Sequence, residues 1–101
     1  SYTGNGTYGA ANAVSIECGF YPLLVMVSSS SSSHYWAVRG FDKFYYNNNR
    51  ENEMTWGDTG VSWYYPQDDQ YYSPSGNQMN TIDTTYYYLV LGYSNDGEQG
   101  N

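Results

Sequence analysis

The sequence contains few of the residues on which several protein classes depend. It has one histidine and three basic residues, Arg39, Lys43 and Arg50, against ten acidic ones, so the formal net charge is −7. Proteins that bind nucleic acid neutralise phosphates with clustered Lys and Arg, and this composition therefore excludes nucleic acid as the partner. It argues in the same way against an anionic membrane surface. An acidic balance favours neutral or cationic partners.

A single cysteine, Cys18, excludes an intrachain disulfide and with it the class of disulfide-stapled secreted modules. Its place in an alternating apolar run predicts a small core residue rather than a nucleophile. One histidine and one cysteine are too few ligands for zinc. The chain has no run of 18 apolar residues and no visible signal peptide, which predicts no membrane insertion.

Aliphatic side chains are also scarce. Leu, Ile, Val and Met occupy Val14, Ile16, Leu23, Leu24, Val25, Met26, Val27, Val38, Met54, Val61, Met79, Ile82, Leu89, Val90 and Leu91. A domain of 101 residues must then fill its core partly with Tyr and Trp, whose polar tips need hydrogen-bond partners. Small modules of this kind often gain stability from assembly.

Tyrosine, serine, glycine and asparagine are abundant instead, with 14, 12, 11 and 10 residues. Antibody-like binding loops favour this mixture, because Tyr provides rigid contact area while Ser, Gly and Asn provide adaptable hydrogen bonds. The alternative is that Tyr and Ser simply suit the exposed faces of β-sheets. The stretch 60–77, GVSWYYPQDDQYYSPSGN, shows the clustering most clearly.

Alternating and continuous apolar runs bounded by turn residues predict strands, and no segment has the spacing of an amphipathic helix. The run LLVMV reads as a strand covered on both faces. We therefore predict an all-β fold, an antiparallel β-sandwich of about six or seven strands with long polar loops. The predicted strands cover residues 14–20, 23–27, 34–40, 54–56, 61–65 and 84–93, and residues 2–8 form a turn or short hairpin.

The length suits one domain, residues 1–101, with a polar C-terminal tail at 94–101. Because the sequence begins at Ser1 rather than Met, we interpret it as part of a longer protein. The six serines at 28–33 are expected to be mobile, since poly-serine buries no apolar surface. Residues 47–52 and 66–80 read as further polar loops.

No catalytic or metal-binding constellation is apparent, and we predict that the protein is not an enzyme and uses no cofactor. A Ser-His-Asp triad would depend on His34 alone, which reads better as a strand or surface residue. Asp68 and Asp69 are adjacent and point apart on a strand or turn, so they make a poor acid–base pair for glycoside hydrolysis. They offer oxygen ligands of the kind calcium takes, but too few for a site.

Four motifs carry a resemblance to a known family. They are YTGNGTYG at 2–9, the Phe20-x-Pro22 step before an apolar strand, the pair TW…GVSWYY at 55–65, and TTYYYLVLGY at 84–93. Together they resemble the C-terminal domain of tail-fibre and receptor-binding proteins from phages and prophages of gut bacteria. The last strand is similar to the aromatic strand that closes fibre heads with an H-type lectin sandwich.

The resemblance implies a β-sandwich knob at the tip of a fibre in the virion, exposed to the extracellular medium and trimeric. It implies docking on a glycan or protein of the host cell surface, and it carries over no catalytic residue. An alternative remains open, in which the domain is a structural module such as a fibre cap, a trimerisation unit or a capsid decoration.

The sequence departs from the family at its polar loops, and these loops hold the predicted binding residues. Rings that stack on sugar C–H faces, beside carboxylates and amides that bind hydroxyls, suit a neutral glycan, and a protein ligand would use the same surface. The predicted ligand-binding residues lie in two loops: Tyr45, Tyr46, Asn47, Asn48 and Asn49 in the first, and Tyr65, Asp68, Asp69, Tyr71, Tyr72 and Asn77 in the second.

Overall fold

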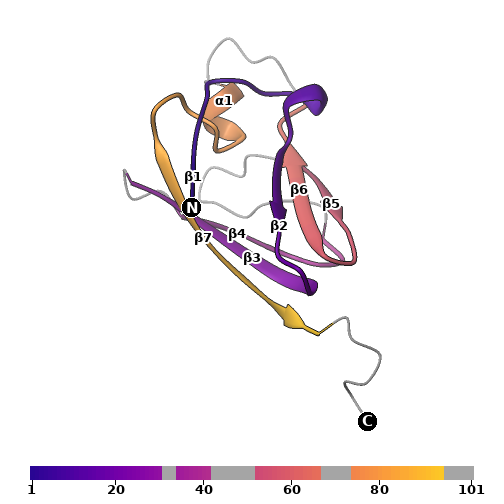
Figure 1. Ribbon diagram of the computed structural model, residues 1–101. Coiled ribbons are helices and arrows are strands. Elements are labelled where there is room, and N and C mark those ends of the chain that lie inside the picture. Colours follow the sequence, from indigo (N-terminus) through magenta and orange to yellow (C-terminus); the bar gives the residue numbers. More distant parts are fainter. Residues whose placement is uncertain (31–33, 42–51, 67–73, 95–101) are drawn as a thin grey trace.

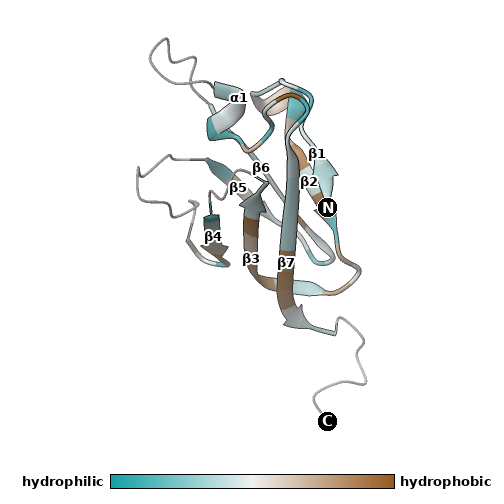
Figure 2. Ribbon diagram, turned by 90° about the vertical axis from the view of Figure 1, so that its left-hand side faces the viewer, coloured by the Kyte–Doolittle hydropathy of each residue, from teal (hydrophilic) through white to brown (hydrophobic). Residues whose placement is uncertain are grey.

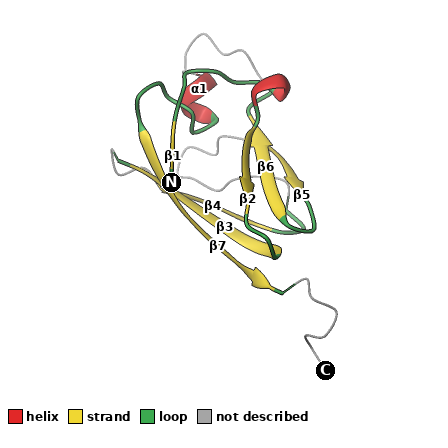
Figure 3. Cartoon of the chain, in the orientation of Figure 1, coloured by secondary structure: helices red, strands yellow, loops and turns green. Residues whose placement is uncertain are grey.

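The computed structural model describes residues 1–30, 34–41, 52–66 and 74–94, which contain seven strands and two short helices (Figures 1 and 3). The elements are β1 (Tyr2–Thr3), the 3-10 helix η1 (Ala10–Asn12), β2 (Val14–Glu17), β3 (Tyr21–Ser29), β4 (His34–Val38), β5 (Glu53–Trp56), β6 (Gly60–Tyr64), α1 (Pro74–Asn77) and β7 (Thr85–Tyr93).

Two antiparallel sheets form a sandwich, as the sequence predicted. One sheet has four strands in the order β1-β7-β3-β4, and the other has three in the order β2-β6-β5. Strands β3 and β6 contact each other across the interface between the layers (Figure 1). Strands β5 and β6 form a hairpin around the turn residues 57–60, and β7 begins one residue later than predicted.

The core lies between the facing sides of the two sheets and is small. Every second residue of β3 and β6 points into it, which the burial of Val25, Val27, Val61 and Trp63 shows. Aromatic rings complete it, because the aliphatic residues are too few to fill the space. The buried members are Val14, Ile16, Val25, Val27, Ala37, Val61, Trp63, Met79 and Tyr86.

The structure corrects two predictions about the early strands. Strand β2 ends at Glu17, and Cys18 is a half-buried turn residue whose thiol approaches the carbonyl oxygens of Phe20 and Thr59 at 3.2 and 3.3 Å. Gly19 follows with φ of +81°, a left-handed conformation that ends the strand. The alternation through Phe20 therefore reflected a strand followed by a tight turn.

Strand β3 is not covered on both faces, so the interpretation of LLVMV was wrong in this respect. Val25 and Val27 are buried, whereas Met26 between them is 45% exposed. The strand also continues into the serine run, where Ser28 and Ser29 pair with Tyr87 and Tyr86 of β7. Cross-strand pairing with these rings therefore outweighs the weak propensity of serine for a β-strand. Residues 31–33 lie outside the described part of the chain.

Residues 74–80, predicted as loop, form α1 and a buried turn. The turn has the hydrogen bonds of a Schellman motif: Asn80 N–H donates to the Ser75 carbonyl and Met79 N–H to the Gly76 carbonyl. Met79 takes the left-handed position, with φ of 60°, that glycine usually occupies. Its fully buried side chain accounts for this choice, because packing offsets the backbone cost. Neither described helix is long or apolar enough to cross a bilayer.

Polar side chains anchor this turn to the N-terminal segment. Asn80 Nδ2 donates to Asn5 Oδ1 at 2.8 Å and to the Thr7 carbonyl at 3.0 Å. The Tyr2 hydroxyl donates to the Met79 carbonyl at 2.8 Å, and its ring stacks on Tyr86 with centroids 5.0 Å apart. These bonds join residues more than 70 positions apart, so they close the end of the sandwich at which α1 lies (Figure 1).

Arg39 joins the two sheets at the opposite end. Its Nε donates to the Pro22 carbonyl at 2.8 Å, and its Nη2 donates to the Gly57 carbonyl in the turn between β5 and β6. The guanidinium lies 3.7 Å from the centroid of the Tyr21 ring and 5.6 Å from that of Trp56. A planar cation that both stacks and donates several hydrogen bonds suits this position better than lysine would.

Tyr2 makes stability sensitive to alkaline pH. Burial raises the pKa of Tyr2 far above its ordinary value of 10.0, and the neighbouring hydroxyls of Tyr86 and Tyr35 raise it further. The folded state therefore holds this proton more tightly than the unfolded chain does. The contribution of Tyr2 to the free energy of unfolding is fully present below pH 10. Above pH 10 it falls by roughly 1.4 kcal/mol per pH unit, because one proton is involved. Denaturant unfolding measured from pH 8 to 12 should show this decline.

The matched variant is Tyr2→Phe, which lacks the titrating hydroxyl. It should be less stable at pH 7, by about 1–3 kcal/mol, because the Met79 carbonyl loses its donor. Its stability should nevertheless fall less steeply above pH 10. Equal slopes in the two proteins would show that Tyr2 does not control the alkaline transition.

Candidate functional site

The most prominent surface is the outer side of the four-stranded sheet. Strands β4, β3 and β7 each contribute three side chains to it, because alternate residues of a strand point to the same side. We call this surface the outer face. Its members are His34, Trp36 and Val38 of β4, Leu24, Met26 and Ser28 of β3, and Tyr87, Leu89 and Leu91 of β7.

Strand register arranges these nine residues in three rows. The middle row is Trp36, Met26 and Leu89, with exposed fractions of 44, 45 and 52%. One flanking row is entirely aliphatic, and the other is His34, Ser28 and Tyr87. Figure 2 shows the resulting concentration of apolar residues on β3 and on the C-terminal half of β7. A contiguous exposed apolar surface of this kind is typical of an interaction site.

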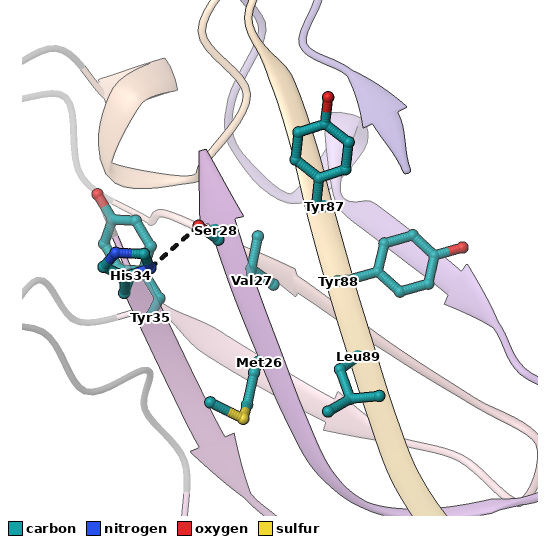
Figure 4. A pocket seen from close by; sticks show the side chains of 8 residues that line it. All are labelled: Met26, Val27, Ser28, His34, Tyr35, Tyr87, Tyr88 and Leu89. Carbon is teal, nitrogen blue, oxygen red and sulfur yellow. Dashed lines mark hydrogen bonds between the residues drawn. The ribbon is translucent and has the colours of Figure 1, made fainter. Parts of the chain in front are cut away.

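A pocket of about 260 Å³ lies at the polar end of the outer face (Figure 4). Apolar atoms dominate its wall, to which one histidine, one serine and three tyrosines also contribute. The described lining residues are Met26, Val27, Ser28, His34, Tyr35, Tyr87, Tyr88 and Leu89. An apolar hollow with a few polar groups at one end is the usual form of a small-ligand or side-chain pocket.

Ser28 and His34 meet at this end, where Ser28 Oγ lies 3.0 Å from His34 Nδ1. Acyl transfer by such a pair needs a third group that orients the imidazole, and oxyanion donors near the serine. The described lining of the pocket contains no carboxylate. The two residues are directly opposite each other on paired strands, so the bond is explained as a cross-strand contact at the end of a hairpin.

Metal binding has no support among residues 1–30, 34–41, 52–66 and 74–94, where no group of three or more His, Cys, Asp or Glu side chains could hold an ion. The oxygen ligands considered from sequence, Asp68 and Asp69, lie outside these ranges.

Only two of the predicted ligand-binding residues are described, and both are buried. Tyr65 is 5% exposed and follows β6, and Asn77 is 8% exposed and ends α1. Their side chains therefore do not lie on the open surface in this structure. The others lie outside the described residues, and their role stays a prediction: Tyr45, Tyr46, Asn47, Asn48, Asn49, Asp68, Asp69, Tyr71 and Tyr72.

One contact brings the ends of the two predicted loops together. Asn52, the last residue of the predicted loop 47–52, donates from Nδ2 to the carbonyl of Asn77 at 2.9 Å. Both residues are buried, so this bond is part of the scaffold on which the loops are mounted. Loops that carry recognition residues are commonly held by rigid elements in this way.

The outer face was missed at the sequence level, although a signal for it existed. Successive tyrosines in the segment Tyr86–Tyr88 must point to opposite faces of a strand, and Tyr86 is indeed buried while Tyr87 is 57% exposed. The run LLVMV hid the rest, because a continuous apolar strand does not reveal which side is covered.

No protein-family model, curated protein or solved structure matches this chain.

Proposed function

We propose that this chain is a non-enzymatic recognition domain that docks on a larger partner through the outer face and its pocket. The observation that carries the proposal is the exposed middle row, Trp36, Met26 and Leu89, beside the polar row that ends in Tyr87. Aromatic and Met side chains are enriched at interfaces, and Trp and Tyr are among the residues that contribute most to the binding energy.

The resemblance to phage fibre domains suggests the biological setting: a knob at the tip of a tail or head fibre in the virion, facing the extracellular medium. The partner would be a glycan or a protein on the surface of a gut bacterium. Tyr rings beside His34 and Ser28 suit either class, since sugars stack on rings and donate hydroxyls to polar tips. The Tyr- and Asn-rich loops would add contacts around the same domain, and a trimer is the assembly that the resemblance implies.

The second candidate is a structural module of the virion, such as a fibre cap, trimerisation unit or capsid decoration. The same apolar surface favours it, because an outer face of this composition also suits permanent contact with a neighbouring virion protein. Direct binding of the isolated domain to cells separates the two functions.

The experiment measures binding of the fluorescently labelled chain to a panel of gut bacteria and to a glycan array. The double variant Trp36→Ala/Met26→Ala removes two directly opposite side chains of the outer face. We expect its affinity to fall at least tenfold, while its melting temperature changes little because both side chains are exposed.

The matched control is Ile82→Ala, which removes an apolar side chain that is 63% exposed and does not belong to the outer face. Its binding should equal that of the parent chain. If the double variant binds like the parent, the outer face is not the recognition surface. If the parent chain binds no cell and no glycan, the structural module is favoured.

A further inference from the structure

Strand β7 has an edge that the described strands cover only in part. Strand β1 pairs with β7 only at Thr85 and Tyr86, although β7 continues to Tyr93. Within the described residues, the seven positions 87–93 therefore have β3 on one side and no strand on the other. Natural proteins usually protect such an edge with charged residues or proline, and this segment, YYLVLGY, contains neither.

Hydrogen bonds show which backbone groups point outward. The Thr84 carbonyl accepts from Gly4 N–H on the β1 side, and the Thr85 carbonyl accepts from Ser30 N–H on the β3 side. Because the direction alternates along a strand, even-numbered residues of β7 point away from β3. The N–H and C=O groups of Tyr88, Val90 and Gly92 are thus directed at the open edge.

The segment is also nearly palindromic about Val90. When it is aligned antiparallel with itself, Tyr87 faces Tyr93 and Leu89 faces Leu91 of the second copy, and Val90 faces its own counterpart. Tyr88 faces Gly92, which brings no side chain against the ring. This register also places the outward groups of Tyr88, Val90 and Gly92 opposite one another, which gives three mutually hydrogen-bonded pairs.

We propose that two copies of this chain associate through antiparallel pairing of β7 with β7 about a twofold axis at Val90. The pairing is isologous, because each copy presents the same edge. It joins the two four-stranded sheets into one continuous sheet. The length also fits. The strand of the second copy ends at Tyr93, which faces Tyr87, and β1 covers the edge of β7 only as far as Tyr86.

The pairing places both outer faces on the same side of the continuous sheet. Tyr87, Leu89, Leu91 and Tyr93 are each at least half exposed in the single chain, and all four acquire cross-strand neighbours in the dimer. Two identical pockets would then point the same way, an arrangement suited to bivalent attachment. This symmetry differs from the trimer that the resemblance implies, and it does not depend on the proposed recognition function.

Mass measurement by light scattering at micromolar concentration tests the assembly. The expected result is twice the 11.5 kDa of one chain. A trimeric mass would overturn the proposal in favour of threefold symmetry. A monomeric mass would also overturn it and leave the edge to a strand of another protein, or to a segment that precedes Ser1 in a longer chain.

Charge pairs test the register. In the proposed dimer, positions 89 and 91 of different copies are directly opposite, in the closely spaced type of pair. The variant Leu89→Lys/Leu91→Lys places like charges there and is expected to be monomeric. The variant Leu89→Lys/Leu91→Glu places a lysine opposite a glutamate twice and is expected to remain dimeric. Both side chains are about half exposed, so both variants should stay folded.

The control for non-specific association is Trp36→Lys, which puts a charge on the outer face two strands away from the open edge. It should leave the dimer intact. Equal masses for the two double variants, or dissociation by Trp36→Lys, would contradict edge pairing in this register. Circular dichroism of each variant confirms that the masses compare folded proteins, and cell binding, measured separately, tests the recognition function alone.

Discussion

Replacement of Gln78 by leucine should unfold the protein or reduce its stability more than any surface change. Gln78 is fully buried, and its side chain satisfies three backbone groups from separate segments. Oε1 accepts from Gly9 N–H at 2.8 Å and from Tyr65 N–H at 2.7 Å, and Nε2 donates to the Asn12 carbonyl at 2.8 Å.

Leucine has a similar size but no polar atom, so all three backbone groups would lose their partner. Each buried group left unsatisfied costs about 1–3 kcal/mol, so three such groups would cost roughly 3–9 kcal/mol. Two of the three bonds are only partly buried, and we therefore expect the lower part of this range, roughly 3–6 kcal/mol. This is a large share of the roughly 5–15 kcal/mol by which domains are stable. Urea denaturation followed by Trp fluorescence measures it, since Trp63 Nε1 donates to the backbone carbonyl of the same Gln78.

The matched control is Asn12→Ala, in the segment that Gln78 holds. Its exposed side chain donates one hydrogen bond to the Tyr8 carbonyl, and the variant should lose less than about 1 kcal/mol. A Gln78→Leu protein as stable as this control would show that the buried network contributes little.

Gly92→Ala is also expected to be strongly destabilising. A Cβ at position 92 would lie 2.0 Å from the Tyr21 carbonyl oxygen and 2.9 Å from Pro22 Cα. The cause is a bulge in β3, where the register with β7 shifts between Pro22 and Leu24 and the two backbones approach closely.

Because backbone atoms block the new methyl group, the strands must separate locally. We expect a loss of at least about 3 kcal/mol, the upper end for overpacking, measured as a fall in melting temperature. Gly57→Ala is the control, since its Cβ would meet nothing closer than the Gly60 carbonyl at 3.4 Å. Similar melting temperatures for the two variants would show that the close approach at Gly92 is not required.

Local pattern was enough to predict the class of fold. Runs such as 61–65 and 84–93 combine β-branched and aromatic residues between turn residues, and each became a strand of an antiparallel sandwich. Val61 and Trp63 lie two residues apart in the predicted strand 61–65, and both are buried in the core because alternate residues along a strand share a face. The scarcity of aliphatic residues likewise explains the buried Tyr86.

Only the tertiary structure decided which apolar surfaces are covered and which polar residues are buried. Met26 and Leu89 are as apolar as Val25, yet they remain exposed because no second layer lies on the outer face within the described residues. Gln78 and Asn80 look like loop residues in sequence, but most of their side-chain hydrogen-bond partners lie more than 60 positions away in the N-terminal segment. Burial and long-range hydrogen bonding depend on how distant segments meet, and a local pattern contains no information about that meeting.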